Sequence, residues 1–364
     1  MTRPRISEAI ARRSVLAGMG GLGALALAGC GETNVDATRV SFLNWQDYVD
    51  PTLLKDFTTA TGLAVGYETY DSNDALASRL TAAEATRKGG RKSTSFDLIV
   101  PSTNLFRRLR AGDFLQALDT SVVTEALLAN LLPTFRALPE DPGNRYAIPW
   151  AYGTTGIGYD TTVFPTPPTW EVFLDAAHKG KMSILKETRE AFALAHLSSG
   201  TSVNSTNAAE ITAAEARLKE MLVNSSLNSA TYLDDLADGK LVAVQGYNTD
   251  VLQARKRNPK IAFVVPEAGG TRWVDLLCIP RSAPNPAGAN RFIAFYLDPK
   301  VSAANAQHNL VATGNQAARK FVPPAVLEDP AIYPPDALQS KLAFIEDLGD
   351  AEKLYDEAWK RVTG

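Results

Sequence analysis

The sequence predicts an α/β fold with a largely parallel sheet. Short apolar segments rich in β-branched and aromatic residues alternate with longer segments that have helical periodicity. The chain has 364 residues and contains neither an internal repeat nor a low-complexity block. The residues that follow an N-terminal leader are enough for two ordinary domains or one large bilobal domain.

The first half of the chain begins with a predicted strand at residues 40–43. Asp50 and Pro51 form a typical N-cap and first-turn pair, and Gly62 is a typical helix end, so a helix is expected between them. The elements expected next are a strand at 63–70, a helix capped by Ser72 or Asn73, and a buried strand at 96–101.

The second half follows a proline-containing loop at residues 139–149, which predicts a crossing between two lobes. An irregular stretch at 159–169 contains three prolines and precedes a predicted helix at 170–177. Further strands are expected at 181–185, 241–245, 261–265 and 274–279, and amphipathic helices at 289–297 and 348–362.

The first 29 residues have the pattern of an export signal. A head with four arginines and one glutamate precedes a glycine-rich apolar run that is shorter than the ~20 residues needed to cross a membrane. The sequence LAGC at residues 27–30 resembles a bacterial lipoprotein box, and Arg12-Arg13 resembles a twin-arginine signal. We therefore expect a signal peptide at 1–29, lipidation of Cys30, a tether at 30–37, and an exported domain anchored to the outer face of the cell membrane. The alternative is a buried N-terminal helix, which such a glycine-rich run would form poorly.

Composition and motifs argue against several classes of function. Removing the leader's net charge of +3 changes the formal charge from −3 to −6, which disfavours nucleic-acid binding. No phosphate-binding loop, nucleophile elbow or metalloprotease helix is present, and the three histidines lie far apart. The glycine-rich run at 153–158 fits a strand and turn better than a dinucleotide site. We therefore expect no catalytic residue, metal or cofactor, and no internal disulfide, because Cys278 is the one cysteine after Cys30.

Aromatic and acidic side chains cluster where the predicted strands begin or end. Ligands of open α/β sheets bind at the carboxyl ends of strands, and carboxylates beside aromatic faces suit an ammonium group. Each residue also has an ordinary structural explanation, such as a turn, a helix start or a core position. Asp275 is the hardest to explain in that way, because a carboxylate beside the apolar run 276–279 needs a partner or a ligand. The candidates are Trp45, Asp47, Ser102, Glu187, Glu190, Tyr247, Trp273 and Asp275.

The run FLNWQDYV at residues 42–49 resembles the start of bacterial spermidine/putrescine-binding proteins of ABC importers. The likeness continues in order through residues 68–73, 97–103, 147–149, 189–192, 267–270, 273–275, 314–315 and 317–320. The resemblance implies a type II periplasmic-binding-protein fold with two lobes, a ligand cleft between them, and no enzymatic activity. It implies that a polyamine and the permease subunits of an ABC transporter are the partners. The lobes would comprise residues 38–148 with 276–312, and 149–275 with 313–364.

The resemblance also assigns roles to the candidate residues. Trp45 and Trp273 would flank the methylene chain, Asp275 would bind an inner amine, and Glu190 would bind one amino end. The side chains towards the other end would be Asp47, Ser102 and Glu187. Tyr247 stands where the family usually has tryptophan. Three positions depart from the family pattern: Asn104 and Val311 replace tyrosines, and Ile345 falls near a ligand-contacting glutamine.

Other functions remain open from the sequence. The same importer component could bind an aminoalkyl phosphonate, an amino-acid-like zwitterion or an opine, with Arg189 or Arg272 holding the anionic group. An extracytoplasmic α/β enzyme would need a nucleophile–base pair or a metal site. A purely structural lipoprotein would leave the carboxylates at the strand ends unexplained.

Overall fold

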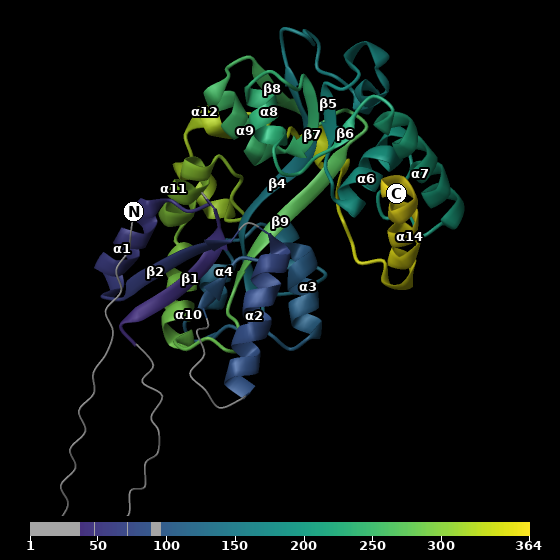
Figure 1. Ribbon diagram of the computed structural model, residues 1–364. Coiled ribbons are helices and arrows are strands. Elements are labelled where there is room, and N and C mark those ends of the chain that lie inside the picture. Colours follow the sequence, from purple (N-terminus) through teal and green to yellow (C-terminus); the bar gives the residue numbers. More distant parts are fainter. Residues whose placement is uncertain (1–36, 47, 71, 89–95) are drawn as a thin grey trace, which may run out of the picture. The chain divides into compact units, whose positions relative to one another are not determined.

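The computed structural model describes residues 37–46, 48–70, 72–88 and 96–364. The predicted signal peptide, Cys30 and the tether through residue 36 lie outside the described residues, as does Asp47. The described residues belong to one compact unit, and the division into two lobes stays a prediction. Within the described part, ten strands form one sheet in the order β2-β1-β3-β9-β4-β7-β5-β6, with β10 beside β9 and β8 beside β4 (Figure 1).

The N-terminal elements follow the predicted pattern closely. The strand β1 (Arg39–Trp45) pairs in parallel with β2 (Ala64–Tyr70) and β3 (Leu98–Ile99). Helix α1 (Pro51–Thr61) begins after Asp50, whose side chain accepts a hydrogen bond from the Thr52 N–H at 2.8 Å. It ends at Gly62, whose φ of 75° is unfavourable for residues with a Cβ. The helices α2 (Asn73–Lys88), α3 (Thr103–Ala111), α4 (Glu125–Leu128) and α5 (Pro133–Arg136) follow.

Two long strands occupy the middle of the sheet. β4 (Ala147–Asp160) and β9 (Gly270–Cys278) pair antiparallel with each other. β9 also pairs with β3, and β4 with β7 (Ala243–Tyr247) and β8 (Ile261–Val264). The shorter strands are β5 (Met182–Ile184), β6 (Ser226–Leu227) and β10 (Leu342–Phe344). The α/β class is confirmed, but the sheet is mixed rather than largely parallel. The strands β4 and β9 pair antiparallel with each other and with β3, β7 and β8, whereas β10 pairs in parallel with β9.

The structure agrees with one local prediction and differs from two others. The glycine-rich run 153–158 lies inside β4, which agrees with its interpretation as strand. The strand continues to Asp160, into the stretch predicted as irregular. The predicted helix at 170–177 is instead two short 3₁₀ helices, η1 (Trp170–Leu174) and η2 (Ala176–His178).

The remaining helices cover the C-terminal half of the chain. They are α6 (Thr188–Ser198), α7 (Ala208–Leu222), α8 (Tyr232–Ala237), α9 (Asn248–Arg257), α10 (Pro286–Tyr296), α11 (Pro299–Asn309), η3 (Gln316–Phe321), α12 (Pro324–Leu327), α13 (Asp336–Gln339), η4 (Gly349–Ala351) and α14 (Glu352–Thr363). None of the helices in the described part of the chain is both long and apolar enough to span a membrane.

Separate groups of buried side chains stabilise the two ends of the sheet. Phe42 of β1 packs with Trp150 and Phe292 in one cluster. Phe192 of α6 packs with Tyr355 of α14 in another. Cys278 is buried in the core and has a free thiol.

Candidate ligand-binding site

One face of β9 carries three of the residues that define the candidate site. Side chains alternate between the two faces of a strand, so Thr271, Trp273 and Asp275 share a face. On β4, Gly153 lies opposite Trp273. A Cβ at Gly153 would lie only 2.3 Å from Trp273 Cζ2 and 2.2 Å from Asn248 Oδ1. The absence of a side chain at Gly153 is therefore what leaves room for the indole ring.

Asp275 lies half-buried at the Trp45 end of this row. Its carboxylate accepts a hydrogen bond from the Tyr48 hydroxyl at 3.0 Å. No lysine or arginine within the described ranges forms an ion pair with it. Burial raises the pKa of Asp275 to about 7, although the bond from Tyr48 acts in the opposite direction. The site thus holds a carboxylate whose negative charge is not neutralised by the protein.

Glu190 lies at the other end of the row, in the first turn of α6. Its carboxylate oxygens accept hydrogen bonds from the hydroxyls of Thr271 at 2.8 Å and Thr155 at 3.2 Å. Burial raises the pKa of Glu190 to about 7, and these hydroxyls oppose the rise. As with Asp275, no cationic side chain of the described residues forms an ion pair with this carboxylate.

Two aromatic side chains contribute to the surface between these carboxylates. Tyr247 ends β7, and its ring meets that of Trp273 edge to face, with centroids 6.4 Å apart. Burial raises the pKa of the Tyr247 hydroxyl well above its ordinary value, and the charges of Glu190 and Glu187 add to the rise. The Trp273 Nε1 donor has no hydrogen-bond partner among the described residues.

Trp45 and Ser102 lie near Asp275 at the ends of β1 and β3. The Trp45 Nε1–H donates to the Val100 carbonyl at 2.9 Å, which fixes the indole against the ring of Tyr70. Ser102 forms an isolated antiparallel bridge with Asp275, and its hydroxyl accepts a hydrogen bond from the Asn73 side chain at 2.8 Å. Segments more than 170 residues apart in the sequence therefore meet here.

Glu187 precedes α6 and remains exposed to solvent. Neighbouring atoms still remove part of its hydration, which raises its pKa, and the negative charge of Asp74 adds to this effect. Asp74 lies in the first turn of α2, and Glu187 directly precedes α6. The N-terminal ends of the two helices therefore carry carboxylates that repel each other. Asp47 lies outside the described residues.

The three positions that depart from the family pattern have different environments. Asn104 is exposed on α3, whereas Val311 is buried in the core beside Ile293 and Tyr296. Ile345 is half-buried, and its carbonyl accepts a hydrogen bond from the Arg107 guanidinium at 2.7 Å.

Sequence reasoning missed several residues of this region. Tyr48, Thr155 and Thr271 bind the two carboxylates. Asp250 is a half-buried carboxylate that accepts a hydrogen bond from the Tyr232 hydroxyl. The two-residue alternation of strand 274–279, extended backwards, would have placed Thr271 on the face of Asp275. Thr155 could not have been found in this way, because its place depends on the register between β4 and β9.

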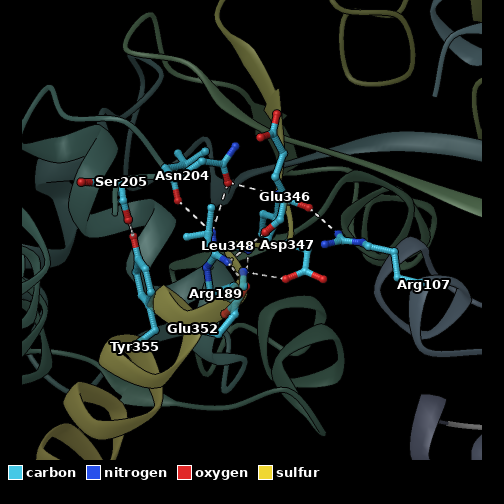
Figure 2. A network of polar contacts seen from close by, with 12 residues as sticks. Arg107, Arg189, Asn204, Ser205, Glu346, Asp347, Leu348, Glu352 and Tyr355 are labelled. Atoms are coloured by element: carbon cyan, nitrogen blue, oxygen red, sulfur yellow. Dashed lines mark hydrogen bonds and ion pairs between the residues drawn. The ribbon is translucent and has the colours of Figure 1, made fainter. Parts of the chain in front are cut away.

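The two arginines considered for an anionic ligand are occupied by protein groups. Arg189 donates to Glu352 at 2.6 Å, to the Glu346 carbonyl at 3.1 Å and to Asn204 at 3.1 Å, within the network of polar contacts drawn in Figure 2. It also stacks over Tyr355. Arg272 donates to Gln339 at 2.6 Å and alternates with Trp273 along β9, so it lies on the opposite face of the strand. In the described part of the chain, no group of three or more His, Cys, Asp or Glu residues is placed to hold a metal ion.

Comparison with known proteins gives consistent matches over almost the whole chain. Residues 52–334 match the family described as bacterial extracellular solute-binding protein. The chain is 34% identical over 343 residues to the spermidine/putrescine-binding periplasmic protein of Escherichia coli, covering 93% of this chain and 96% of the relative. It is 32% identical over 365 residues to the putrescine-binding periplasmic protein PotF of the same organism, covering 93% and 95%. Among solved structures, the spermidine/putrescine ABC transporter substrate-binding protein PotD from Streptococcus pneumoniae superposes with a TM-score of 0.80 at 27% identity, covering 89% of this chain and 98% of that one.

Proposed function

The chain belongs to the bacterial extracellular solute-binding proteins, and from this premise we propose that it captures a polyamine for an ABC importer. It has the α/β fold of the periplasmic binding proteins and is a solute-binding, non-enzymatic component of an ABC transporter. The expectation that it is not an enzyme is therefore confirmed by its family.

The observation that carries the polyamine proposal is the row formed by Glu190, Trp273 and Asp275. The buried carboxylate of Glu190 and the half-buried carboxylate of Asp275, both without a cationic partner among the described residues, flank an indole ring. A buried carboxylate is costly unless it is paired, so a ligand that supplies positive charge at both ends would remove that cost. The ring between them suits methylene groups and adjacent ammonium groups.

The length of the row supports a ligand with several amines. At about 3.3 Å per residue, the Cα atoms of Thr271 and Asp275 are roughly 13 Å apart, and Glu190 is bonded to Thr271. With single bonds near 1.5 Å, an extended spermidine spans roughly 11 Å between its terminal nitrogens, and putrescine roughly 6 Å. The triamine is thus long enough to extend along much of this row, with one amino end at Glu190 and its inner amine on the side of Asp275. The relatives' names, which include spermidine and putrescine, support the same ligand class.

In the proposed binding mode, the ligand lies between two lobes that close over it. Closure is favoured because the ligand contacts groups from both proposed lobes, such as Trp45 on one and Glu190 with Tyr247 on the other. The groups proposed for the second amino end are Asp47, Ser102 and Glu187. The permease then recognises the closed form.

We place this activity outside the cytoplasm, as the family description supports. The proposed route is export through the signal peptide at 1–29, followed by attachment to the membrane through lipidated Cys30. The membrane anchor keeps the binding protein close to its permease.

A calorimetric and thermal-shift screen of a chain that begins at residue 31 tests the ligand class. The compounds are putrescine, spermidine, spermine, agmatine, 4-aminobutyrate and 2-aminoethylphosphonate. A polyamine at ~100 times its dissociation constant is expected to add ~2.7 kcal/mol to the free energy of unfolding. Binding of a zwitterion without any response to polyamines would refute the proposed ligand while leaving the transport role intact.

A further inference from the structure

We propose that Thr155 and Thr271 are positioning residues that hold the Glu190 carboxylate ionised and aimed at the ammonium group of the ligand. This inference rests on the proposed function and assigns a role to two hydroxyls that do not themselves need to touch the ligand.

The geometry of the two threonines is specific for one carboxylate. Thr155 of β4 and Thr271 of β9 are register partners on adjacent strands, and both are buried. The Thr155 hydroxyl donates to Glu190 Oε1 at 3.2 Å and the Thr271 hydroxyl to Glu190 Oε2 at 2.8 Å. Each oxygen therefore has its own donor, so the carboxylate cannot rotate without losing a hydrogen bond. Donors of this kind stabilise the charged form over the protonated form.

The backbone of Glu190 is held by a different group. Gln245 Nε2 donates to the Glu190 carbonyl at 2.8 Å, while Gln245 Oε1 accepts from the Leu185 N–H at 3.2 Å. The start of α6 is thus fixed to β7 and to the residue that follows β5 without either threonine. Removing one threonine hydroxyl should therefore change the ionisation and orientation of the Glu190 carboxylate and leave α6 in place.

The charged groups around Glu190 make the hydroxyls important. Burial favours its neutral form and so does the charge of Glu187, whereas the Arg189 guanidinium, which is bonded elsewhere, favours the charged form only weakly. The hydrogen bonds from Thr271 and then Thr155 are the strongest influences that favour the anion. The nearby Tyr247 hydroxyl stays neutral because its pKa is raised well above the ordinary value.

The neighbour of Thr155 provides a matched control. Thr154 is also buried on β4 but points to the other face, and its hydroxyl has no hydrogen-bond partner among the described residues. Thr154→Val therefore makes the same substitution in the same strand without changing Glu190. Thr271→Ser keeps the hydroxyl and serves as the conservative variant.

The experiment measures the ionisation of Glu190 and the affinity for spermidine in the wild type and these variants. Carbon-13 NMR of labelled glutamate follows the titration of Glu190 in the ligand-free protein, with Glu190→Gln identifying the signal. In Thr271→Val, and in the same direction in Thr155→Val, we expect the Glu190 midpoint to rise by about one pH unit. The dissociation constant at pH 7 should then increase about 5-fold, with recovery above pH 8. Thr271→Ser and Thr154→Val should keep the wild-type midpoint and affinity.

Two results would overturn the inference. One is a Glu190 midpoint in Thr271→Val that equals that of the wild type. The other is a loss of affinity that is the same at every pH, which would indicate a packing role. A wild type that binds no polyamine would refute the proposed function instead, and the NMR titration would still decide whether the threonines hold the charge.

Discussion

Lowering the pH from 8 to 6 should weaken polyamine binding to the wild-type protein strongly, because protons compete with the ligand for Glu190 and Asp275. Both carboxylates have pKa values of about 7 in the ligand-free protein, since burial favours their neutral forms. An ammonium group placed beside either carboxylate favours the charged form. Ligand binding therefore lowers both pKa values and releases protons.

The expected magnitude follows from these two ionisations. A group with a pKa of about 7 is about nine-tenths ionised at pH 8 and about one-tenth ionised at pH 6. If both carboxylates must be ionised in the complex, the two fractions multiply, and the affinity falls on the order of 100-fold between pH 8 and pH 6. Close to two protons should be released per ligand at pH 6, and few at pH 8.

The same two carboxylates also affect the stability of the ligand-free protein. Polyamine affinity increases as the pH rises, whereas their contribution to stability decreases. Their pKa values are raised above the ordinary values of 4.5 and 3.8, so the folded protein binds these protons more tightly than the unfolded chain. Their contribution to stability is complete below about pH 4 and is lost as the pH rises towards about 7. The free energy of unfolding that the ligand adds should therefore increase between about pH 4 and about pH 7, the range in which the ligand-free protein loses this contribution.

Isothermal titration calorimetry at pH 6, 7 and 8 tests the prediction, with two buffers of different ionisation enthalpy at each pH. The dependence of the observed heat on the buffer gives the number of protons released. Asp275→Asn should reduce that number by about one, and Asp350→Asn, at a highly exposed carboxylate, should leave it unchanged. Equal dissociation constants at pH 6 and pH 8, without a buffer effect, would refute the reasoning.

The remaining predictions concern single positions. Gly153→Ala should displace Trp273, because the new Cβ would overlap its ring and Asn248 Oδ1. Calorimetry should then show an affinity at least 10-fold weaker, while the circular dichroism spectrum stays that of the wild type. Trp273→Ala should cost ~1–3 kcal/mol of binding free energy through lost stacking and cation–π contact; wild-type affinity would place the ring outside the site. Asp275→Asn should weaken binding by roughly 100-fold at pH 8, since it leaves a buried ammonium group unpaired. Cys30→Ser should move the exported protein from the membrane to the soluble fraction, and retention at the membrane would contradict the lipid anchor.

Local sequence patterns were sufficient for much of the fold. The cap formed by Asp50 and the glycine at 62 set the ends of α1, and the apolar runs at 40–43 and 96–101 lie in and around β1 and β3. These features depend on backbone preferences and side-chain alternation over a few residues, which a sequence displays directly. The irregular stretch predicted at 159–169 was partly wrong, because pairing with β7 and β8 extends β4 to Asp160.

The candidate site, like the fold, could be predicted only in part from the sequence. The sequence identified the aromatic and acidic side chains at the strand ends, and Asp275 stood out because its apolar neighbours predicted burial. It also left open an anionic ligand group bound by Arg189 or Arg272, but these arginines are held by Glu352 and Gln339 in the structure. A guanidinium's partners come from distant segments, so no local pattern shows whether it is free.

The sequence by itself determined the class of fold and the chemical types of the side chains available for binding, and it predicts an export signal at residues 1–29. The tertiary structure alone decided that Thr155 lies opposite Thr271 and that both face Glu190, and that Gly153 leaves space for Trp273. The physical reason is that the register between β4 and β9 is fixed by contacts between segments more than 100 residues apart. A shift of one residue would turn every one of these side chains to the other face of the sheet.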